Sequence, residues 1–308
     1  MTINFSGKVA VITGAGNGLG RQYALLLASL GAKVVVNDLG AALDGMAANN
    51  SPAEKVAAEI RASGGEARAN GDNVTDPEGA ARMVRQAIDA FGRLDILVCN
   101  AGILRDRSLL KMSNDDFAQV MDVHMTGAYL CVKAAAPAMI EQGFGRIVLT
   151  TSPSGLFGNF GQSNYGAAKM ALVGFANTLK LELGRKGVLV NCIAPSAITR
   201  MTESILDEEH AEALLPEYVA PMVAYLCSDA CSCNGEIFAA GANHFAINRM
   251  VQGPGVTFSG GVPSIDDIAG RISEISTLEG ALPYQSGVDH TARLMEEYRA
   301  ANASGNGN

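Results

Sequence analysis

The stretch TGAGNGLG, residues 13–20, decides the fold, because it follows directly on a short apolar run. Its glycines fit the pattern GxxxGxG through Gly14, Gly18 and Gly20, whereas GxGxxG would need a third glycine where Arg21 stands. A strand that turns directly into a helix needs residues without a Cβ, so that backbone and helix N-terminus can approach a pyrophosphate. The stretch predicts a dinucleotide-binding turn, with a simple glycine-rich turn as the alternative.

Strand-length apolar runs alternate with longer helix-like segments along most of the chain. The strand-like runs lie at 8–13, 33–38, 94–100, 145–152 and 188–195, and segments with apolar residues at helical spacing lie at 21–30, 54–63 and 81–91. The runs are apolar throughout, which is typical of parallel strands buried on both faces. The pattern predicts an α/β fold: a doubly wound (Rossmann) parallel sheet of about seven strands with helices on both faces.

The chain is predicted to be one domain followed by a C-terminal extension. Residues 1–250 show no internal repeat and no linker, so we expect a single dinucleotide-binding domain there. A Gly/Pro-rich break follows at 253–263, and 264–276 and 290–300 resemble short helices. We expect 251–308 to be an extension that is partly helical, with a frayed end.

Composition limits the classes of partner. The 308 residues are 18% charged and 48% hydrophobic, which is typical of a compact globular protein. The formal net charge of −8 and the lack of a Lys/Arg run disfavour nucleic acid and leave a small molecule as the expected partner. No apolar run reaches the roughly 18 residues of a membrane span, and neither a secretory signal nor a peroxisomal Ser-Lys-Leu ending is present. We therefore expect a cytoplasmic protein without membrane contact.

The six cysteines raise the question of a metal site. Cys227, Cys231 and Cys233 lie together in CSDACSC, but there is no CxxC pair and no histidine at ligand distance. We expect buried or turn cysteines and no metal.

Asp38 closes the second strand-like run, twenty residues after Gly18. An acidic side chain there can accept hydrogen bonds from the adenosine ribose hydroxyls and would repel a 2′-phosphate. Its neighbours Asn37 and Leu39 are not basic, so the cofactor is expected to be NAD and not NADP. The alternative is a solvated carboxylate at a strand end.

Tyr165 and Lys169 are four residues apart in 163–183, which is predicted to be a long helix, and so lie on one face. A tyrosine titrates near pH 10, and lowering its pKa by about three units takes roughly 4 kcal/mol. One ammonium at about 4 Å supplies about that much at an effective dielectric near 20. The lysine can therefore activate the phenol, although this spacing also occurs in surface pairs.

Two further features complete a known set. Ser152 lies thirteen residues before Tyr165 at the end of a strand-like run, and Asn100-Ala101-Gly102 follows the preceding run. Together with TGxxxGxG and YxxxK, they resemble the short-chain dehydrogenase/reductase family over about residues 5–245.

The resemblance implies roles for these residues. Tyr165 would be the general base that takes the proton of a substrate alcohol as hydride leaves for the nicotinamide. Ser152 would hold the substrate oxygen, and Lys169 would lower the tyrosine pKa and bind the nicotinamide ribose. The domain 1–250 would thus include the catalytic site. The implied cofactor-binding residues are Gly14, Asn17, Gly18, Leu19, Gly20, Asp38, Asp72, Asn73, Val74, Asn100, Ala101, Gly102, Tyr165, Lys169 and Ile198.

Longer segments resemble one branch of the family, the (3R)-hydroxyacyl-CoA dehydrogenase unit of peroxisomal multifunctional enzyme type 2. They are NDLG at 37–40, GILRDRS at 102–108, GNFGQSNY at 158–165, RMT at 200–202 and PEYVAP at 216–221. The resemblance implies a stand-alone enzyme that oxidises a (3R)-hydroxyacyl-CoA to the 3-oxoacyl-CoA. Three residues depart from the usual family pattern: Cys99, Pro153 and Arg200.

The segment 200–219 stands at the family's substrate-lid position, or else is a helix packed on the core. The apolar residues that could cover a substrate are Met201, Ile205, Leu206, Leu214 and Leu215. The cations Arg105, Arg107 and Arg200 either meet the phosphates of an acyl-CoA or pair with neighbouring acids. The family resemblance also implies a homodimer or homotetramer formed through helices at about 107–140 and 163–185.

Two other functions remain open. A hydroxysteroid dehydrogenase would act on steroid alcohols or on an acyl-CoA with a steroid remnant, because the same kind of pocket accepts flat polycyclic alcohols. A catalytically idle NAD-binding protein would serve as a regulatory or scaffold subunit, but the complete Ser152, Tyr165 and Lys169 set disfavours it.

His124 lies in MDVHMTG, residues 121–127, where the wider family normally has asparagine. The family residue sits at a helix kink, and its backbone carbonyl binds a water that links the catalytic lysine to solvent. A histidine would preserve that relay and add a group that titrates near neutral pH. His124 is therefore a fourth candidate catalytic residue, with a buried core histidine as the alternative.

Overall fold

The apolar run before the glycine stretch forms strand β1, Val9–Ile12, and all four of its side chains are buried. They alternate between the two faces of the sheet: Val9 and Val11 belong to one hydrophobic cluster, and Ala10 and Ile12 belong to the other. Burial on both faces explains why the run has no polar positions.

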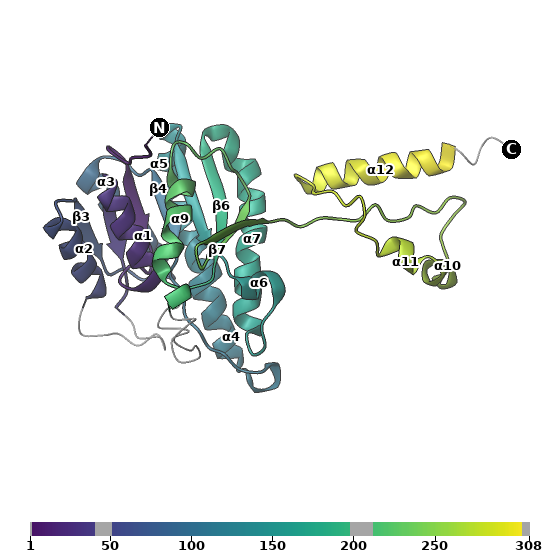
Figure 1. The fold of residues 1–308 in the computed structure, drawn as a ribbon, viewed down its shortest axis with the longest axis horizontal. Coiled ribbons are helices and arrows are strands. Elements are labelled where there is room, and N and C mark those ends of the chain that lie inside the picture. The colour runs from purple at the N-terminus through teal and green to yellow at the C-terminus, as the bar shows by residue number, and fades with distance from the viewer. Residues whose placement is uncertain (1, 41–50, 198–211, 304–308) are drawn as a thin grey trace. The chain divides into compact units, whose positions relative to one another are not determined.

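The computed structural model describes residues 2–40, 51–197 and 212–303. Within them, one sheet has eight strands in the order β3-β2-β1-β4-β5-β6-β7-β8 (Figure 1). The other strands are β2 (Lys33–Asn37), β3 (Ala67–Asn70), β4 (Ile96–Cys99), β5 (Gly145–Thr150), β6 (Val188–Pro195), β7 (Ile237–Gly241) and β8 (His244–Asn248). The first seven are parallel, which confirms the predicted α/β doubly wound sheet.

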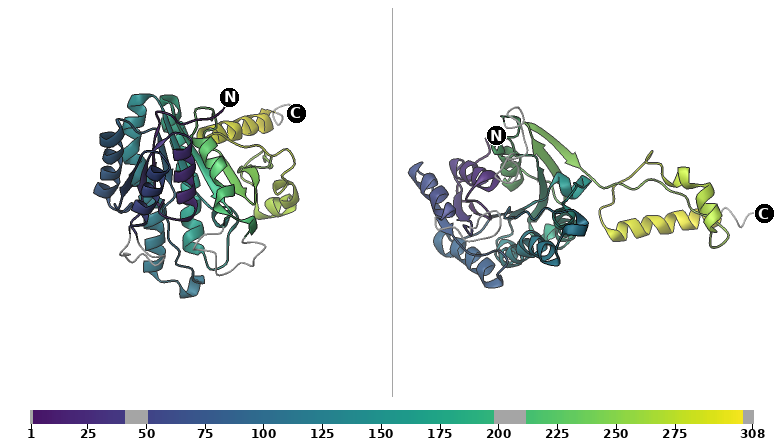
Figure 2. Two further views of the ribbon diagram at one scale, coloured as in Figure 1. Left: turned by 60° about the vertical axis from the view of Figure 1, so that its left-hand side comes forward. Right: turned by 90° about the horizontal axis from the view of Figure 1, so that it is seen from below.

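Helices cover both faces of this sheet (Figure 2). One hydrophobic cluster contains residues of α1 (Gly18–Ser29), α2 (Pro52–Ala62) and α9 (Ala220–Cys227). The opposite cluster contains residues of α3 (Pro77–Phe91), α5 (Gly127–Gln142) and α7 (Ser163–Leu183). Two shorter helices are α4 (Asn114–Met121) and α6 (Pro153–Phe157).

The eighth strand is the difference from the expected seven. β8 pairs antiparallel with β7 through a tight turn in which Ala242 and Asn243 have φ of 48° and 57°. Two consecutive positive φ values are typical of the hairpin turn that matches the twist of paired strands. Asn tolerates this conformation, but Ala rarely adopts it, so the turn has no strong sequence signal.

The order in which strands are added to the sheet changes direction at β1: β2 and β3 lie on one side of it, and β4 and the later strands lie on the other. β1 is flanked by β2 on one side and by β4 on the other. In an open parallel sheet, a crevice forms at the carboxyl ends of the strands at such a point, and ligands bind there. All the expected site residues within the described ranges follow the carboxyl ends of strands or lie on helices near them.

A second compact unit, Arg249–Asn308, follows the unit Met1–Asn248. Its helices are α10 (Ile265–Gly270), α11 (Ile272–Ile275) and α12 (Gly287–Ala303). The expected helix at 264–276 is thus two helices, and the last helix begins three residues before 290. None of the described residues in 249–303 is buried, so the described part of this unit has no hydrophobic core.

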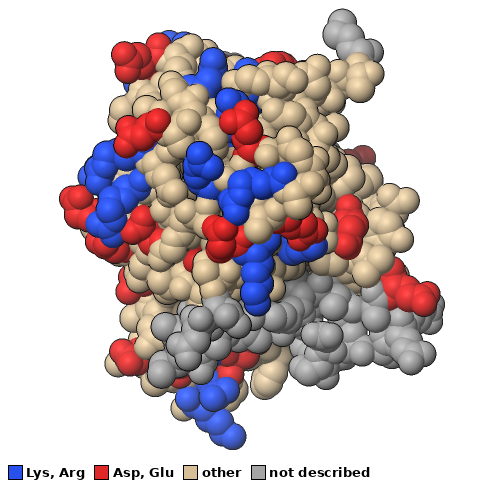
Figure 3. Space-filling view, turned by 90° about the vertical axis from the view of Figure 1, so that its left-hand side faces the viewer, with Lys and Arg blue, Asp and Glu red and all other residues tan. Residues whose placement is uncertain are grey.

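The distribution of surface charge and the apolar character of the helices are relevant to the kinds of partner that the protein can bind. Basic and acidic side chains are interspersed over the face of the molecule shown in Figure 3. In the part of the chain that the structure describes, no helix combines the length and apolar character needed to cross a membrane.

Asp95 ties the start of β4 to β1, and we expect its removal to destabilise the sheet. Its fully buried carboxylate accepts hydrogen bonds from the Val9 amide (2.9 Å) and from Arg93 (2.6 and 2.7 Å). Asp95→Ala should lower the free energy of unfolding by about 2 kcal/mol, because it leaves the buried Val9 amide unpaired, whereas the half-exposed Arg93 guanidinium can be hydrated. Urea unfolding followed by circular dichroism measures this change.

The matched control is Asp89→Ala, an exposed acid on α3. It should change the free energy of unfolding by less than about 0.5 kcal/mol. Equal effects of the two substitutions would contradict the structural role of Asp95.

Candidate active site

The three glycines of the GxxxGxG pattern are each required by the geometry of the turn after β1. Gly14 and Gly18 have positive φ values of 62° and 52°. A Cβ on Gly14 would lie 2.8 Å from the Ala101 Cα, and a Cβ on Gly20 would lie 2.4 Å from the Gly14 carbonyl oxygen. The turn, helix α1 and the loop after β4 are therefore packed backbone to backbone.

Helix α1 begins at this turn with its first amides available to a ligand. Its N-cap residue Asn17 is extended, and its side chain forms no capping hydrogen bond. Uncapped amides at a helix N-terminus, together with the helix dipole, bind phosphate groups. The turn thus fits the pyrophosphate of a dinucleotide, and Gly14, Asn17, Gly18 and Leu19 line the adjoining cleft.

Asn100 joins the end of β4 to the glycine turn. Its Nδ2 donates to the carbonyl oxygens of Thr13 and Gly14, at 3.1 Å each. In return, the hydroxyl of Thr13 accepts the amides of Asn100 (2.9 Å) and Ala101 (3.1 Å). Sequence reasoning missed Thr13, although a hydroxyl residue directly before the first glycine was a usable signal.

Asp38 organises the loop after β2 and faces the cleft. Its two carboxylate oxygens accept hydrogen bonds from the amides of Gly16 (3.0 Å) and Gly40 (2.9 Å). A Cβ on Gly16 would lie 2.6 Å from the carboxylate, which explains the extra glycine in the turn. Because each oxygen keeps a second lone pair and Asp38 lines the cleft, it can still accept bonds from ribose hydroxyls.

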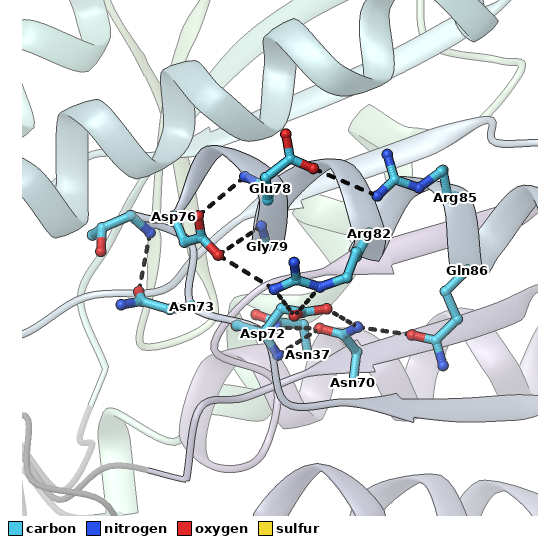
Figure 4. Close-up of polar contacts among 11 residues, drawn as sticks. Asn37, Asn70, Asp72, Asn73, Asp76, Glu78, Gly79, Arg82, Arg85 and Gln86 are labelled. Carbon is cyan, nitrogen blue, oxygen red and sulfur yellow. Dashed lines mark hydrogen bonds and ion pairs between the residues drawn. The ribbon is translucent and has the colours of Figure 1, made fainter.

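A polar network holds Asp72, which follows strand β3 just as Asp38 follows strand β2 (Figure 4). Arg82 donates to one carboxylate oxygen at 2.7 and 2.9 Å, and Asn70 donates to the other at 2.9 Å. Asn37 donates to the Asp72 carbonyl oxygen at 2.9 Å. Asp72, Asn73 and Val74 line the cleft, as an adenine pocket requires.

The catalytic candidates come from the carboxyl end of β5 and the first turns of α7. Ser152 is the N-cap of α6, where its hydroxyl accepts the Ser154 amide at 3.1 Å, and Pro153 is the first residue of that helix. Ser152 and Tyr165 line the same cleft, and the Ser152 side chain acts to lower the pKa of Tyr165. The structure therefore brings the serine and the tyrosine hydroxyls together at the cleft.

Lys169 lies beneath Tyr165 but does not lower its pKa in the protein alone. Its Nζ donates to the Thr150 carbonyl oxygen at 2.5 Å and lies 5.5 Å from the centroid of the tyrosine ring. Burial lowers the pKa of Lys169 to about 7. Burial raises the pKa of Tyr165, the nearby Ser152 side chain opposes that rise, and the charge of Asp106 adds to it. The sequence predicted that Lys169 lowers the pKa of Tyr165. In the structure, burial instead raises the pKa of the tyrosine and lowers that of the lysine.

His124 lies in a π-helical turn, Asp122–Thr126, between α4 and α5, where a kink was expected. Its Nε2 is 2.9 Å from the Ile103 carbonyl oxygen and 3.2 Å from the Ile103 amide nitrogen. The imidazole contacts the Tyr165 ring edge-on, with centroids 5.2 Å apart. A Cβ on Gly102 would lie 2.2 Å from the His124 Cε1, so the histidine needs that glycine.

The interpretation of His124 as a group that titrates near neutral pH is wrong. Burial, and then the charge of Lys169, lower the pKa of His124 well below its usual value. The neutral ring buries Nδ1 without a hydrogen-bond partner among the described residues. A role for its backbone or side chain in a proton relay stays a prediction.

One cleft of about 560 Å³ joins these groups. Its lining includes Gly14, Asn17, Gly18 and Leu19 of the glycine turn, but not Gly20. It also includes Asp38, Asp72, Asn100, Ser152, Tyr165, Lys169 and His124. Ile198 lies outside the described residues, as do Arg200, Met201, Ile205 and Leu206 of the expected lid. Leu214 and Leu215 do not line the cleft, and neither do Arg105 and Arg107, although Asp106 between them does.

The cysteines form no bridges. All six lie in the described ranges as free thiols, and Cys99, Cys131, Cys192, Cys227 and Cys231 are buried. Among the described residues, no cluster of three or more His, Cys, Asp or Glu could hold a metal ion.

Asn164 is a positioning residue that sequence reasoning missed. Its fully buried side chain donates to the carbonyl oxygens of Arg105 (3.0 Å) and Asp116 (3.3 Å). Its Oδ1 accepts the Tyr165 amide at 2.7 Å. It therefore fixes the start of α7 against the loop after β4, and its place directly before the tyrosine was the available signal.

Comparison with known proteins extends these observations. A family model described as short chain dehydrogenase matches residues 8–210. A short-chain type dehydrogenase/reductase of Mycobacterium tuberculosis is 49% identical over 274 residues, which cover 89% of this chain and 96% of that protein. A hydroxyacyl-CoA dehydrogenase of the same organism is 37% identical over 271 residues, which cover 83% of this chain and 80% of that protein.

A larger relative and two solved structures are also similar. Peroxisomal multifunctional enzyme type 2 of Drosophila melanogaster is 51% identical over 265 residues, and the chain spans only 43% of its length. The structure of that full-length enzyme matches with a TM-score of 0.83 and 39% identity, covering 98% of this chain and 51% of that one. A 7α-hydroxysteroid dehydrogenase complexed with NADH and a 7-oxo bile acid matches with a TM-score of 0.70 and 30% identity, covering 78% and 94%.

His124→Asn tests whether the imidazole takes part in chemistry. We expect kcat for the alcohol that the protein oxidises to fall less than about tenfold, because backbone groups persist at this π-helical turn. The pH profile of kcat between about pH 6 and 8 should keep its shape, because the neutral His124 does not titrate there. Steady-state kinetics across that range measure both effects.

Circular dichroism and thermal unfolding of the variant provide the control for folding. A loss of more than about a hundredfold in a folded variant, or the disappearance of an ionisation near neutral pH, would implicate the imidazole itself.

Proposed function

The chain belongs to the short-chain dehydrogenase family of oxidoreductases, and we propose that it oxidises (3R)-3-hydroxyacyl-CoA thioesters to 3-oxoacyl-CoA with NAD. The observation that carries this proposal is one cleft that holds both the glycine turn and the Ser152–Tyr165 pair. The similarity to a hydroxyacyl-CoA dehydrogenase and to multifunctional enzyme type 2 supports the substrate class.

The residues of the cleft divide the chemistry among them. NAD, when bound along the glycine turn, supplies the hydride acceptor. Tyr165 acts as the base once its phenol has lost a proton, a step that burial of the phenol opposes. Its oxygen then takes the proton of the substrate hydroxyl while the hydrogen on the same carbon leaves as hydride. The Ser152 hydroxyl donates a hydrogen bond to the substrate oxygen and so holds it within reach of Tyr165.

Lys169 is fixed next to Tyr165 by hydrogen bonds to the end of β5 and the residue after it. Its anchor on the Thr150 carbonyl directs the side chain, and Thr151 donates to the Lys169 carbonyl oxygen at 2.6 Å. The lysine can hold the nicotinamide ribose while staying close to the tyrosine. With a pKa of about 7, it can also exchange a proton at neutral pH.

A hydroxysteroid dehydrogenase is the second candidate. The similarity to the 7α-hydroxysteroid dehydrogenase, which covers 78% of this chain, favours it. A substrate screen separates the two functions, with (3R)- and (3S)-hydroxyacyl-CoAs of several lengths beside free steroid alcohols. NADH formation is the readout.

We expect the (3R)-hydroxyacyl-CoAs to give the highest kcat/KM in that screen. Tyr165→Phe should lose at least a thousandfold in kcat, because phenylalanine has no hydroxyl to take the substrate proton. NADH formation at 340 nm measures both. Tyr129→Phe is the matched control, since that exposed tyrosine lies on α5 away from the cleft, and it should stay within about twofold of wild type.

A faster rate on steroid alcohols would favour the second candidate. Unchanged turnover of every alcohol in Tyr165→Phe would remove the tyrosine from the mechanism, and NAD binding without turnover would favour a regulatory NAD-binding protein.

NAD preference is predicted to depend on the charge of Asp38. In Asp38→Asn, the side-chain amide oxygen can still accept a hydrogen bond from the Gly16 amide, but the negative charge that repels a 2′-phosphate is gone. The ratio of kcat/KM for NAD to that for NADP should fall at least tenfold, as measured by parallel cofactor titrations. A wild-type preference for NADP, or an unchanged ratio in the variant, would contradict this role.

A further inference from the structure

The lining of the cleft is acidic. In the described part of the chain it carries four carboxylates, Asp38, Asp72, Asp106 and Asp122, and one cationic side chain, Lys169. Asp38 and Asp72 lie in the part of the cleft that fits a dinucleotide. Asp106 comes after β4 and lines the same cleft as the catalytic candidates Ser152 and Tyr165.

Asp106 is held in place although its side chain is exposed. Gln162, three residues before Tyr165, donates from Nε2 to the Asp106 Oδ2 at 2.8 Å. The backbone on both sides is also fixed: the Arg107 amide donates to the Gly161 carbonyl oxygen at 2.9 Å, and the Arg105 carbonyl oxygen accepts from Asn164 at 3.0 Å. The Asp106 carboxylate is therefore held at the exposed opening of the cleft, called the mouth below.

Neither neighbouring arginine forms an ion pair with the Asp106 carboxylate within the described residues. Arg105 reaches Gln119 (3.5 Å) and Asp116 (3.9 Å), and Arg107 donates to the backbone carbonyl of Asp106 at 2.8 Å. Within the described residues, Asp106 forms no ion pair, and its bonded partner Gln162 is neutral. Its charge is close enough to the phenol of Tyr165 to raise the pKa of that group.

We propose that Asp106, held by Gln162, is a specificity-determining residue that repels substrates with a carboxylate beside the reacting carbinol. Free 3-hydroxy acids carry a negative charge two carbons from the oxidised carbon. A thioester removes that charge, and the phosphates of CoA lie beyond the long pantetheine arm. The acidic mouth thus selects thioesters over the free acids of the same chain. This inference rests on the proposed function.

The test compares Asp106→Asn with wild type on (3R)-3-hydroxybutyrate and on its N-acetylcysteamine thioester. Asparagine keeps an oxygen for Gln162 and removes the charge. We expect the ratio of kcat/KM for the free acid to that for the thioester to rise about tenfold, because a neighbouring like charge at a partly exposed site repels by that order. The effect of the Asp106 charge on the pKa of Tyr165 is common to both substrates and cancels in this ratio.

Two controls assign the effect to this position. Asp115→Asn makes the same change in net charge at an exposed site on α4 that does not line the cleft, and it should leave both rates unchanged. Added salt should raise the wild-type rate on the free acid, through screening, and should affect the Asp106→Asn rate less.

The outcomes separate this inference from the proposed function. If the thioester is oxidised but the ratio of the two rates is the same in wild type and Asp106→Asn, the role of Asp106 is overturned. If no hydroxyacyl thioester is oxidised, the proposed function fails instead. Asp106 is then tested by calorimetric binding of acetoacetate in the presence of NADH: about tenfold tighter binding by Asp106→Asn supports the filter, and equal binding overturns it.

Discussion

The close contact between the end of β1 and the end of β4 is the constraint on which the rest of the site depends. The Asn100 amide bridges two successive carbonyls of the glycine turn, and the Thr13 hydroxyl returns two bonds to the loop after β4. This exchange leaves no room for a Cβ on Gly14. It places the N-terminus of α1 beside the loop that carries Gly102 and Asp106, so the cofactor end and the substrate end share one cleft.

Much of this arrangement could be predicted from the sequence, because it depends on local patterns. Runs without polar positions indicate strands buried on both faces, and the spacing of Tyr165 and Lys169 places them on one face of a helix. The glycine pattern specifies a turn that only residues without a Cβ can form. The order of these features along the chain then fixes the switch point where the cleft forms.

What the sequence did not indicate depends on contacts between distant segments. β8 depends on a hairpin turn whose Ala242 gives no signal for a positive φ. Asn164 and Gln162 resemble ordinary polar residues until the loop after β4 packs beside them. The pKa values of His124 and Tyr165 follow from burial, which raises or lowers them according to the charge of each ionised form. The sequence already offered a buried core histidine as one interpretation of His124, whereas the neighbours of Tyr165 in the sequence do not indicate its burial.

The proposed reaction requires the cleft to hold C3 of a hydroxyacyl thioester beside the nicotinamide while Tyr165 takes the hydroxyl proton. Mass spectrometry of the NADH formed from (3R)-3-hydroxybutyryl-CoA deuterated at C3 tests this claim most directly. Direct hydride transfer predicts one deuterium in each NADH produced. NADH without deuterium, or no NADH from this substrate, would contradict it.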